Sequence, residues 1–260
     1  MPSYTTIDGL NIAYRTFGSG RPLVLVHGWM VSGAVFDPII EALAGAGFEL
    51  FIPDQRGTGD SAQPPYDYTL ANYTRDLLGL IEAVGLKKFD MLGHSMGGQI
   101  AQLTAIELGD RVENLVLMCS VPAVGVPLPD ELRLLFRTCG NKPEAKKQIL
   151  GMACKQLDDA GLEHIMKTSA TCTPMCIAEG FEAWTAGGFQ DQLGKISAAK
   201  TWVIGTDDPF LPPEVLEPNI VEPIANAEFV HVPGPGHYPQ VEAPDVTSAK
   251  LIELLGARAS

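Results

Sequence analysis

Apolar residues along this chain fall into two repeating patterns. Short runs that are largely apolar are typical of parallel strands that helices cover on both faces. Longer stretches repeat apolar residues every three or four positions, as the buried face of an amphipathic helix does. Strands are expected at 23–26, 49–52, 89–92, 115–118, 201–204 and 228–231. Helices are expected between them, at 36–43, 70–84, 99–108, 213–224 and 244–255.

This alternation of strand and helix predicts an α/β fold with a mostly parallel central sheet and helices on both faces. Ahead of it, residues 4–7 and 11–17 flank Asp8-Gly9, a dipeptide that strongly favours a hairpin turn. The chain is therefore expected to begin with a β-hairpin at the start of the sheet.

The alternation breaks between residues 121 and 200. This stretch opens with a series of prolines and continues with helix-like segments, without a convincing strand. We therefore predict a core domain made of residues 1–120 and 201–260, and an α-helical lid insertion, 121–200, over the carboxyl edge of the sheet. Helices of this insertion are expected at 132–137, 144–154 and 162–168.

The insertion carries large apolar side chains at helical spacing, which either line an adaptable pocket or hold the lid together. We predict Phe181 and Trp184 as substrate-binding residues. Met152, Met166 and Met175 leave the same two alternatives open. Substrate choice is thus expected to depend on the insertion.

Composition narrows the partners of the protein. The 260 residues suit one large domain with an insertion, and a formal charge of −13 disfavours nucleic acid and anionic membranes, which attract lysine and arginine clusters. We find no secretory signal and no apolar run of roughly 20 residues, so the protein is expected to be soluble and cytoplasmic. Its five cysteines are expected to be reduced thiols. Cys172 and Cys176 are one helical turn apart, but no nearby pair completes a zinc site, so no metal is expected.

A candidate nucleophile lies between a predicted strand and a predicted helix. The pentapeptide Gly93-His94-Ser95-Met96-Gly97 fits Gly-x-Ser-x-Gly in the strand–turn–helix context of a nucleophile elbow. Such a turn is strained, and the glycines remove side chains that would obstruct it. We predict Ser95 as the nucleophile, the alternative being a serine that only caps the helix.

Three other polar motifs follow predicted strands. They are His27-Gly28-Trp29, Gly205-Thr206-Asp207-Asp208 and Gly236-His237. Because parallel strands end at one edge of a sheet, where α/β proteins bind ligands, we expect these motifs to meet Ser95 there. The residues alone leave Asp207 and Asp208 as alternative acids.

The order Ser…Asp…His, together with the glycine-rich run Asp54-x-Arg56-Gly57-x-Gly59-x-Ser61, resembles the lid-bearing α/β-hydrolase family over nearly the whole chain. The family's Gly-x-x-Asp spacing implies Asp208 rather than Asp207. The resemblance implies a catalytic triad of Ser95, Asp208 and His237, an oxyanion hole made by the backbone N–H groups of Trp29 and Met96, and substrate contacts near His27 and Gly28.

The resemblance also implies a reaction class. Dehalogenases and epoxide hydrolases of this family have an aspartate where Ser95 stands, so they are set aside. Trp29 directly after His27-Gly28 resembles small bacterial aryl-ester hydrolases and cofactor-free haloperoxidases. Hydrolysis of a small-molecule ester or lactone through an acyl-enzyme is expected, without a cofactor. Alternatives are a carbon–carbon bond hydrolase of ring-cleavage diketones, a perhydrolase and a non-catalytic ligand receptor.

The other histidines are expected to support the site or lie outside it. His94 should be turned away from the nucleophile as packing behind it. His27, besides its possible substrate contact, and His231 are expected to be structural, and His164 to lie on the surface or in the lid.

Asp54 and Arg56 resemble a substrate clamp. A structural ion pair or a loop anchor is the preferred interpretation, because both lie in the glycine-rich loop after the strand at 49–52.

Overall fold

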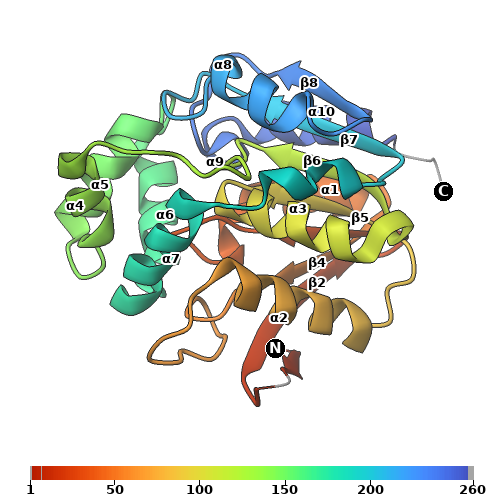
Figure 1. The fold of residues 1–260 in the computed structure, drawn as a ribbon, viewed down its shortest axis with the longest axis horizontal. Helices are drawn as coiled ribbons and strands as arrows, with labels where there is room; N and C mark the ends of the chain where they lie inside the picture. Colours follow the sequence, from red (N-terminus) through yellow and green to blue (C-terminus); the bar gives the residue numbers. More distant parts are fainter. Residues whose placement is uncertain (1, 7, 257–260) are drawn as a thin grey trace.

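The computed structural model describes residues 2–6 and 8–256 (Figure 1). Within them, eight strands form one sheet in the order β1-β2-β4-β3-β5-β6-β7-β8. The strands are β1 (Ser3–Thr5), β2 (Asn11–Gly18), β3 (Arg21–Val26), β4 (Phe48–Pro53), β5 (Phe89–His94), β6 (Val112–Met118), β7 (Lys200–Gly205) and β8 (Ala227–His231). All pairs from β4 to β8 are parallel, which confirms the predicted parallel centre.

The predicted hairpin is confirmed at the edge of the sheet. β1 pairs with β2 in antiparallel register, and β2 pairs with β4 in the same sense. Ile7, which the prediction included in the first strand, lies outside the described residues. The central strand β3 has Leu23 to Val26 buried to 1% exposure or less, as a continuous apolar run covered on both faces requires.

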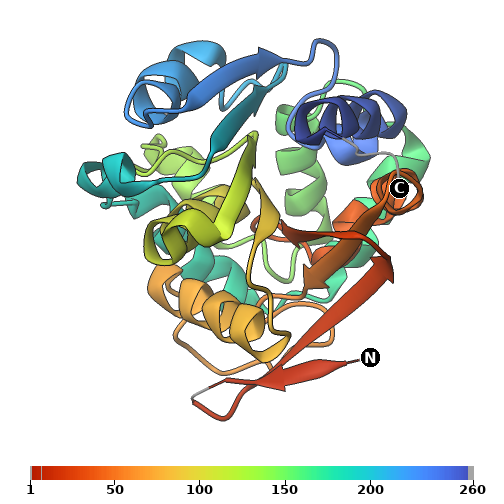
Figure 2. The same cartoon turned by 90° about the vertical axis from the view of Figure 1, so that its right-hand side faces the viewer.

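Helices cover both faces of the sheet. In Figure 2, α1 (Asp37–Gly45) and α10 (Pro244–Leu255) lie on one face, and α2 (Leu70–Ala83) and α3 (Met96–Leu108) lie on the other. The long stripe of apolar residues on α2, including Tyr73, Leu77 and Ile81, is buried as the 3.6-residue period predicts.

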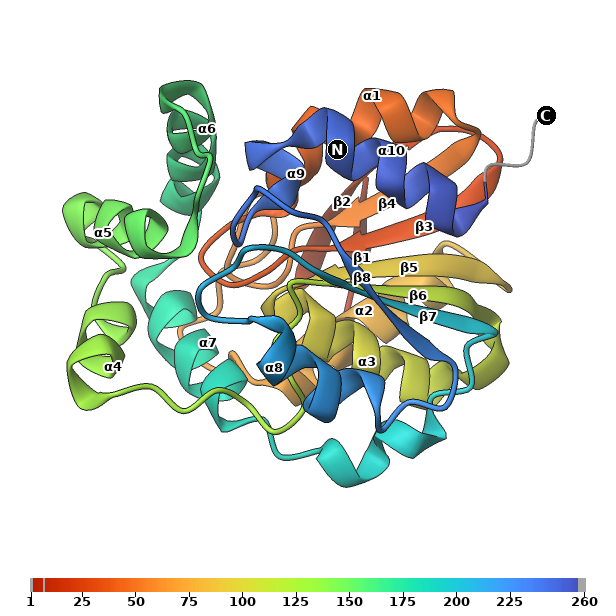
Figure 3. The same cartoon turned by 90° about the horizontal axis from the view of Figure 1, so that it is seen from above.

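The chain between β6 and β7 is helical, with no strand among its residues, all of which are described. It forms α4 (Asp130–Arg137), α5 (Pro143–Ala153), α6 (Asp159–Ala170) and α7 (Pro174–Ala186). Figure 3 shows these helices together beyond one end of the strands. Our segment predictions omitted α7, although Thr173-Pro174 marks its start: Thr173 Oγ1 accepts a hydrogen bond from Cys176 N, and proline suits the first helical position. The function of this segment as a lid stays a prediction.

The helix predicted at 213–224 begins as α8 (Pro213–Leu216) and widens into a π-helical turn, Glu217–Val221. Pro218 has no N–H to donate within an α-helix, and the Glu222 N–H instead donates to Glu217 O at 3.0 Å. A short helix, α9 (Pro239–Glu242), precedes α10. No helix in the described part of the chain has both the length and the apolar character needed to span a bilayer.

Candidate active site

Ser95 lies at the sharp turn between β5 and α3. Its backbone has φ 56° and ψ −125°, a region that non-glycine residues rarely occupy. A Cβ on Gly97 would lie 2.2 Å from Val26 O, and one on Gly93 would lie 2.4 Å from Gly97 O. The two glycines therefore allow the helix to pass close to the strands, as the motif predicts.

The ends of β5, β7 and β8 bring three predicted residues into one hydrogen-bonded chain. Ser95 Oγ lies 3.0 Å from His237 Nε2, and His237 Nδ1 lies 2.6 Å from Asp208 Oδ2. The second oxygen of Asp208 accepts a hydrogen bond from Phe210 N at 2.9 Å. With the carboxylate as acceptor, the imidazole donates from Nδ1, and Nε2 is left to accept the Ser95 proton.

The neighbouring acid points elsewhere. Asp207 Oδ1 lies 3.0 Å from His231 Nε2, and its other oxygen accepts from Gly234 N at 2.9 Å. Its side chain is 46% exposed, whereas that of Asp208 is fully buried. The structure thus joins Asp208, not Asp207, to His237, and gives His231 the structural contact expected of it.

His94 and His27 are buried behind the site. His94 Nε2 donates to His237 O at 2.7 Å, and burial, with His237 close by, lowers the pKa of His94 to about 3. His27 Nδ1 donates to Gly28 O, while its Nε2 accepts from Gln55 N at 3.0 Å. Burial also lowers the pKa of His27. Lowered pKa values favour the neutral form of both imidazoles, and both hold backbone groups in place, as expected for His94 and for a structural His27.

The predicted oxyanion donors have no competing acceptor. Met96 is the first residue of α3, so its N–H has no partner within the helix. Neither that N–H nor the one of Trp29 donates to another described residue. A Cβ on Gly28 would lie 2.8 Å from Ser95 Cβ, so only glycine lets this loop approach Ser95 so closely. Both donors are therefore available to a ligand oxygen.

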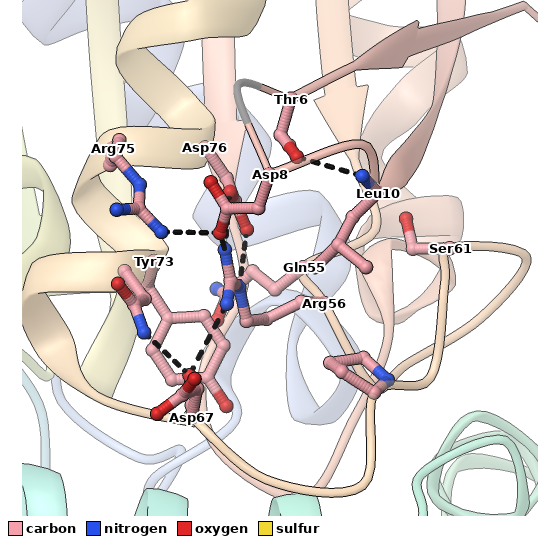
Figure 4. A network of polar contacts seen from close by, with 12 residues as sticks. Thr6, Asp8, Leu10, Gln55, Arg56, Ser61, Asp67, Tyr73, Arg75 and Asp76 are labelled. Atoms are coloured by element: carbon pink, nitrogen blue, oxygen red, sulfur yellow. Dashed lines mark hydrogen bonds and ion pairs between the residues drawn. The ribbon is translucent and has the colours of Figure 1, made fainter.

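Asp54 and Arg56 do not pair with each other, and each has a structural partner elsewhere. Arg56, only 1% exposed, binds both oxygens of Asp76 on α2 at 2.6 and 2.7 Å and reaches Asp8 at 3.4 Å (Figure 4). Asp54 instead accepts from Gly33 N at 2.8 Å and from a second backbone N–H farther along its own loop. Arg56 thus forms a structural ion pair and Asp54 anchors its loop, which agrees with the interpretation preferred from the sequence over a substrate clamp.

An apolar cavity opens onto Ser95 and His237, with about 570 Å³ of space between its atoms, part of it open to solvent. None of its lining residues is Asp, Glu, Lys or Arg. Most of the wall is aliphatic or aromatic: Met30, Val126, Leu128, Phe136, Ile149, Trp184 and Leu211.

Of the predicted substrate-binding residues, Trp184 lies on this wall. Phe181 is fully buried, with its ring centroid 5.2 Å from that of Trp184, and it is not among the residues that line the cavity. His27 and Gly28 are not among the lining residues either. None of Met152, Met166 and Met175 lines the cavity; Met175 is 46% exposed on the outer side of α7. His164, on α6, is partly buried and contacts Ala34 O.

Sequence reasoning missed Glu242 on α9. Its Oε2 accepts from the N–H groups of Gly236, Lys155 and Gln156 at 2.9, 2.7 and 2.8 Å, and its Oε1 accepts from Tyr238 N at 2.9 Å. The carboxylate thus brackets His237 and ties its loop to the end of α5. The only signal in the sequence was an acid a few residues after His237, which does not by itself identify its donors.

Among the described residues, no group of three or more His, Cys, Asp or Glu side chains is arranged to hold a metal ion.

Comparison with known proteins agrees with this geometry. A family model for the alpha/beta hydrolase fold matches residues 21–148. A non-heme chloroperoxidase of Streptomyces lividans is 30% identical, over 95% of this chain and 98% of that protein. The chain belongs to the α/β-hydrolase family.

One further relative and one solved structure extend the likeness. A non-heme haloperoxidase of Rhodococcus erythropolis is 26% identical over 98% of this chain and 99% of its own. The solved structure of an esterase from Exiguobacterium antarcticum, 23% identical, superimposes with a TM-score of 0.90 over 97% of this chain and 98% of that one. As an α/β-hydrolase, the chain carries a serine, a histidine and a buried carboxylate linked at the carboxyl edge of its sheet, an arrangement able to transfer a proton from the serine.

Proposed function

We propose that this chain is a serine hydrolase that cleaves a neutral carboxylic ester or lactone through an acyl-enzyme. The observation that carries the proposal is the hydrogen-bonded chain from Ser95 Oγ through His237 to Asp208, at 3.0 and 2.6 Å, at the mouth of an apolar cavity. Serine is a weak nucleophile at neutral pH and needs such an adjacent base.

In the first half of the reaction, His237 Nε2 takes the proton of Ser95 as Oγ attacks the carbonyl carbon. The N–H groups of Trp29 and Met96 donate to the oxyanion of the tetrahedral intermediate, and the N-terminus of α3 favours its negative charge. The intermediate collapses as His237 returns the proton to the departing alkoxide. Water, activated by the same imidazole, then hydrolyses the acyl-enzyme and restores Ser95.

Asp208 orients His237 and stabilises its protonated form. Its side chain is fully buried, and one oxygen is held by Phe210 N, so the other stays aimed at Nδ1. A carboxylate in this place supports the tautomer in which Nε2 is free to accept the proton.

The charge of the cavity favours a neutral substrate. A ring-cleavage product that carried a carboxylate would bury that charge among side chains that include no Lys or Arg. An unpaired buried charge is strongly unfavourable. The cavity therefore supports ester or lactone hydrolysis over carbon–carbon bond hydrolysis of such acids.

Helices α4 to α7 form the proposed lid, the insertion of residues 121–200. Phe136 on α4, Ile149 on α5 and Trp184 on α7 all face the cavity, so the insertion supplies part of the wall that selects the substrate. The core supplies the reacting groups.

Perhydrolysis is a second candidate, because two of the similar proteins are named non-heme haloperoxidase and non-heme chloroperoxidase. In that reaction hydrogen peroxide, instead of water, attacks the acyl-enzyme, and a peracid leaves while Ser95 recovers its proton. Adding hydrogen peroxide to the ester assay and titrating peracid measures how the acyl-enzyme partitions.

The test of the proposed function is a burst of p-nitrophenol from p-nitrophenyl butyrate. We expect wild-type turnover and its loss in Ser95→Ala, with the exposed Ser197→Ala as a matched control that keeps full activity. A serine-reactive phosphonate should label Ser95 in wild type only. No turnover over a panel of esters and lactones, together with no adduct in folded protein, would exclude the hydrolase and favour a ligand receptor.

A further inference from the structure

Two polar side-chain atoms of the cavity wall have no role in the proposed chemistry and no partner among the described residues: Trp184 Nε1, which is closed off from solvent, and the hydroxyl of Tyr238. Tyr238 lines the cavity and is only 4% exposed. Its hydroxyl forms no hydrogen bond with another described residue. It is also absent from the set of polar atoms that are fully closed off and unpaired, so part of its surface is accessible. Because the side chain has so little exposed surface and borders the cavity, we take the hydroxyl to face that space.

The Tyr238 ring is held in a fixed position. It packs edge-on against His237, with centroids 5.1 Å apart and planes at 84°, and also contacts the His94 ring at 5.1 Å. Its backbone N–H donates to Glu242 at 2.9 Å. A donor held this rigidly loses little freedom when a ligand binds, so it selects ligands by the position of their acceptor atom.

The hydroxyl is a neutral donor in an apolar wall. Burial, with the thiol of Cys154 nearby, raises the pKa of Tyr238 well above its ordinary value, so the group stays protonated. The lining residues Met30, Ile149 and Ala153 offer no side-chain oxygen or nitrogen as an alternative acceptor. A buried donor without a partner is unfavourable, and a ligand oxygen that pairs with it removes that cost.

We propose that Tyr238 forms a polar subsite for an uncharged oxygen acceptor of the substrate, such as an ether, carbonyl or hydroxyl oxygen. The inference rests on the proposed function and narrows its substrate class. The substrates are neutral esters or lactones that carry, outside the scissile ester group, one further oxygen on an otherwise apolar chain. Tyr238 is a specificity-determining residue in this proposal, separate from the groups that act on the scissile carbonyl.

The test uses matched p-nitrophenyl esters in which an ether oxygen replaces one methylene at successive positions of the acyl chain. A second series, of alkyl esters, carries the ether oxygen in the alcohol part. We expect wild-type kcat/KM to peak at one oxygen position, about tenfold above the all-carbon ester, the equivalent of about 1.4 kcal/mol. Tyr238→Phe, which keeps the ring, should remove that preference and leave all-carbon esters within about twofold.

Two outcomes would overturn the subsite. One is an equal loss of kcat for every ester in Tyr238→Phe, which would place the hydroxyl at the reacting carbonyl. The other is a wild-type profile without a peak, a result that needs no variant to fold. Tyr73→Phe is the matched control: Tyr73 is buried on α2, 3.5 Å from Cys176 Sγ, and does not line the cavity, so its loss should keep the peak.

Binding separates this inference from the proposed function. Dissociation constants of the same esters, measured by calorimetry with Ser95→Ala, should show the same tenfold preference, and the double variant with Tyr238→Phe should not. If wild type bound the oxygen-bearing ligands preferentially without turning any over, the hydrolase would fail and the subsite would stand. Equal affinities would reject the subsite even if the esters were hydrolysed.

Discussion

Asp207 and Asp208 are neighbours in sequence with opposite surroundings. Asp208 is buried against His237, whereas Asp207 is half exposed and pairs with His231 in the loop after β8. Both acids lie in the loop that follows β7, where one side chain is bound to His231 and the other to His237, so only Asp208 meets the histidine next to Ser95. Because their partners differ, substituting each acid separately tests which of them acts on His237.

We expect Asp208→Asn to lower kcat by about 10⁴-fold, because an amide there allows the wrong imidazole tautomer and does not stabilise the imidazolium. Asp207→Asn should leave kcat nearly unchanged, since it weakens only an exposed contact of about 0–1 kcal/mol. Initial rates with a p-nitrophenyl ester measure both. Loss of activity in Asp207→Asn alone would assign the roles the other way.

The sequence predicted the residues whose positions depend on nearby chain geometry. Ser95 directly follows β5 and His237 lies in the loop after β8, so their place at the carboxyl edge follows from the fold. Phe181 and Trp184 are three residues apart on one helix, and which of them reaches the cavity depends on how α7 packs against Trp29 and Phe136. No local sequence pattern contains that information. The place of Tyr238 in the cavity wall was not predicted, because it too depends on long-range packing.

At the scale of elements, Glu242 joins two neighbouring parts of the chain to a segment 86–87 residues earlier. Its carboxylate links α9, the loop of His237 and the connection between α5 and α6, and the His237 N–H donates to Ala153 O at 3.0 Å. The imidazole is therefore positioned partly by the proposed lid. A shift of the α5 end would be transmitted to the base.

Glu242→Gln tests this coupling. One amide group keeps a single acceptor oxygen, so some backbone N–H groups that the carboxylate satisfies face an NH₂ group instead. We expect kcat to fall by roughly 10–100-fold with a smaller change in KM, since small misplacement of a catalytic group has effects of that size. Steady-state kinetics well below the melting temperature measure it.

Glu253→Gln, at an exposed residue paired with Lys250, is the matched control and should retain wild-type kcat. A purely structural role of Glu242 would lower the melting temperature and leave kcat of the folded enzyme unchanged. That result would contradict the positioning role.

At the scale of the whole molecule, the alternating pattern was sufficient to predict the layered architecture, because a parallel strand covered on both faces must be apolar throughout. The π-helical turn after α8 and the packing of four helices beyond the strand ends were not predictable in detail. They depend on where Pro218 interrupts hydrogen bonding and on contacts between distant segments. The same long-range packing buries His27 and His94 beneath the site.

These two histidines make stability depend on pH. The pKa of His94 is about 3 in the folded protein and about 6.5 in an unfolded chain, and burial lowers that of His27 as well. Between those values the unfolded state binds more protons, so the free energy of unfolding rises with pH and levels off above about 6.5. Acidification from pH 6.5 to 4.5 should therefore remove about 2–3 kcal/mol through His94 alone.

Urea unfolding at a series of pH values measures this slope, and His94→Gln isolates the His94 share. Glutamine keeps an N–H donor for His237 O but does not titrate, so the variant should lose stability less steeply by up to about 1.4 kcal/mol per pH unit over this range. Asp76 and Asp90, whose pKa values burial raises, contribute with the opposite sign at the acid end, but equally in both proteins. Parallel stability curves for wild type and variant would mean that His94 titrates alike in the folded and unfolded states, contrary to its burial and to its Nδ1, which has no partner among the described residues.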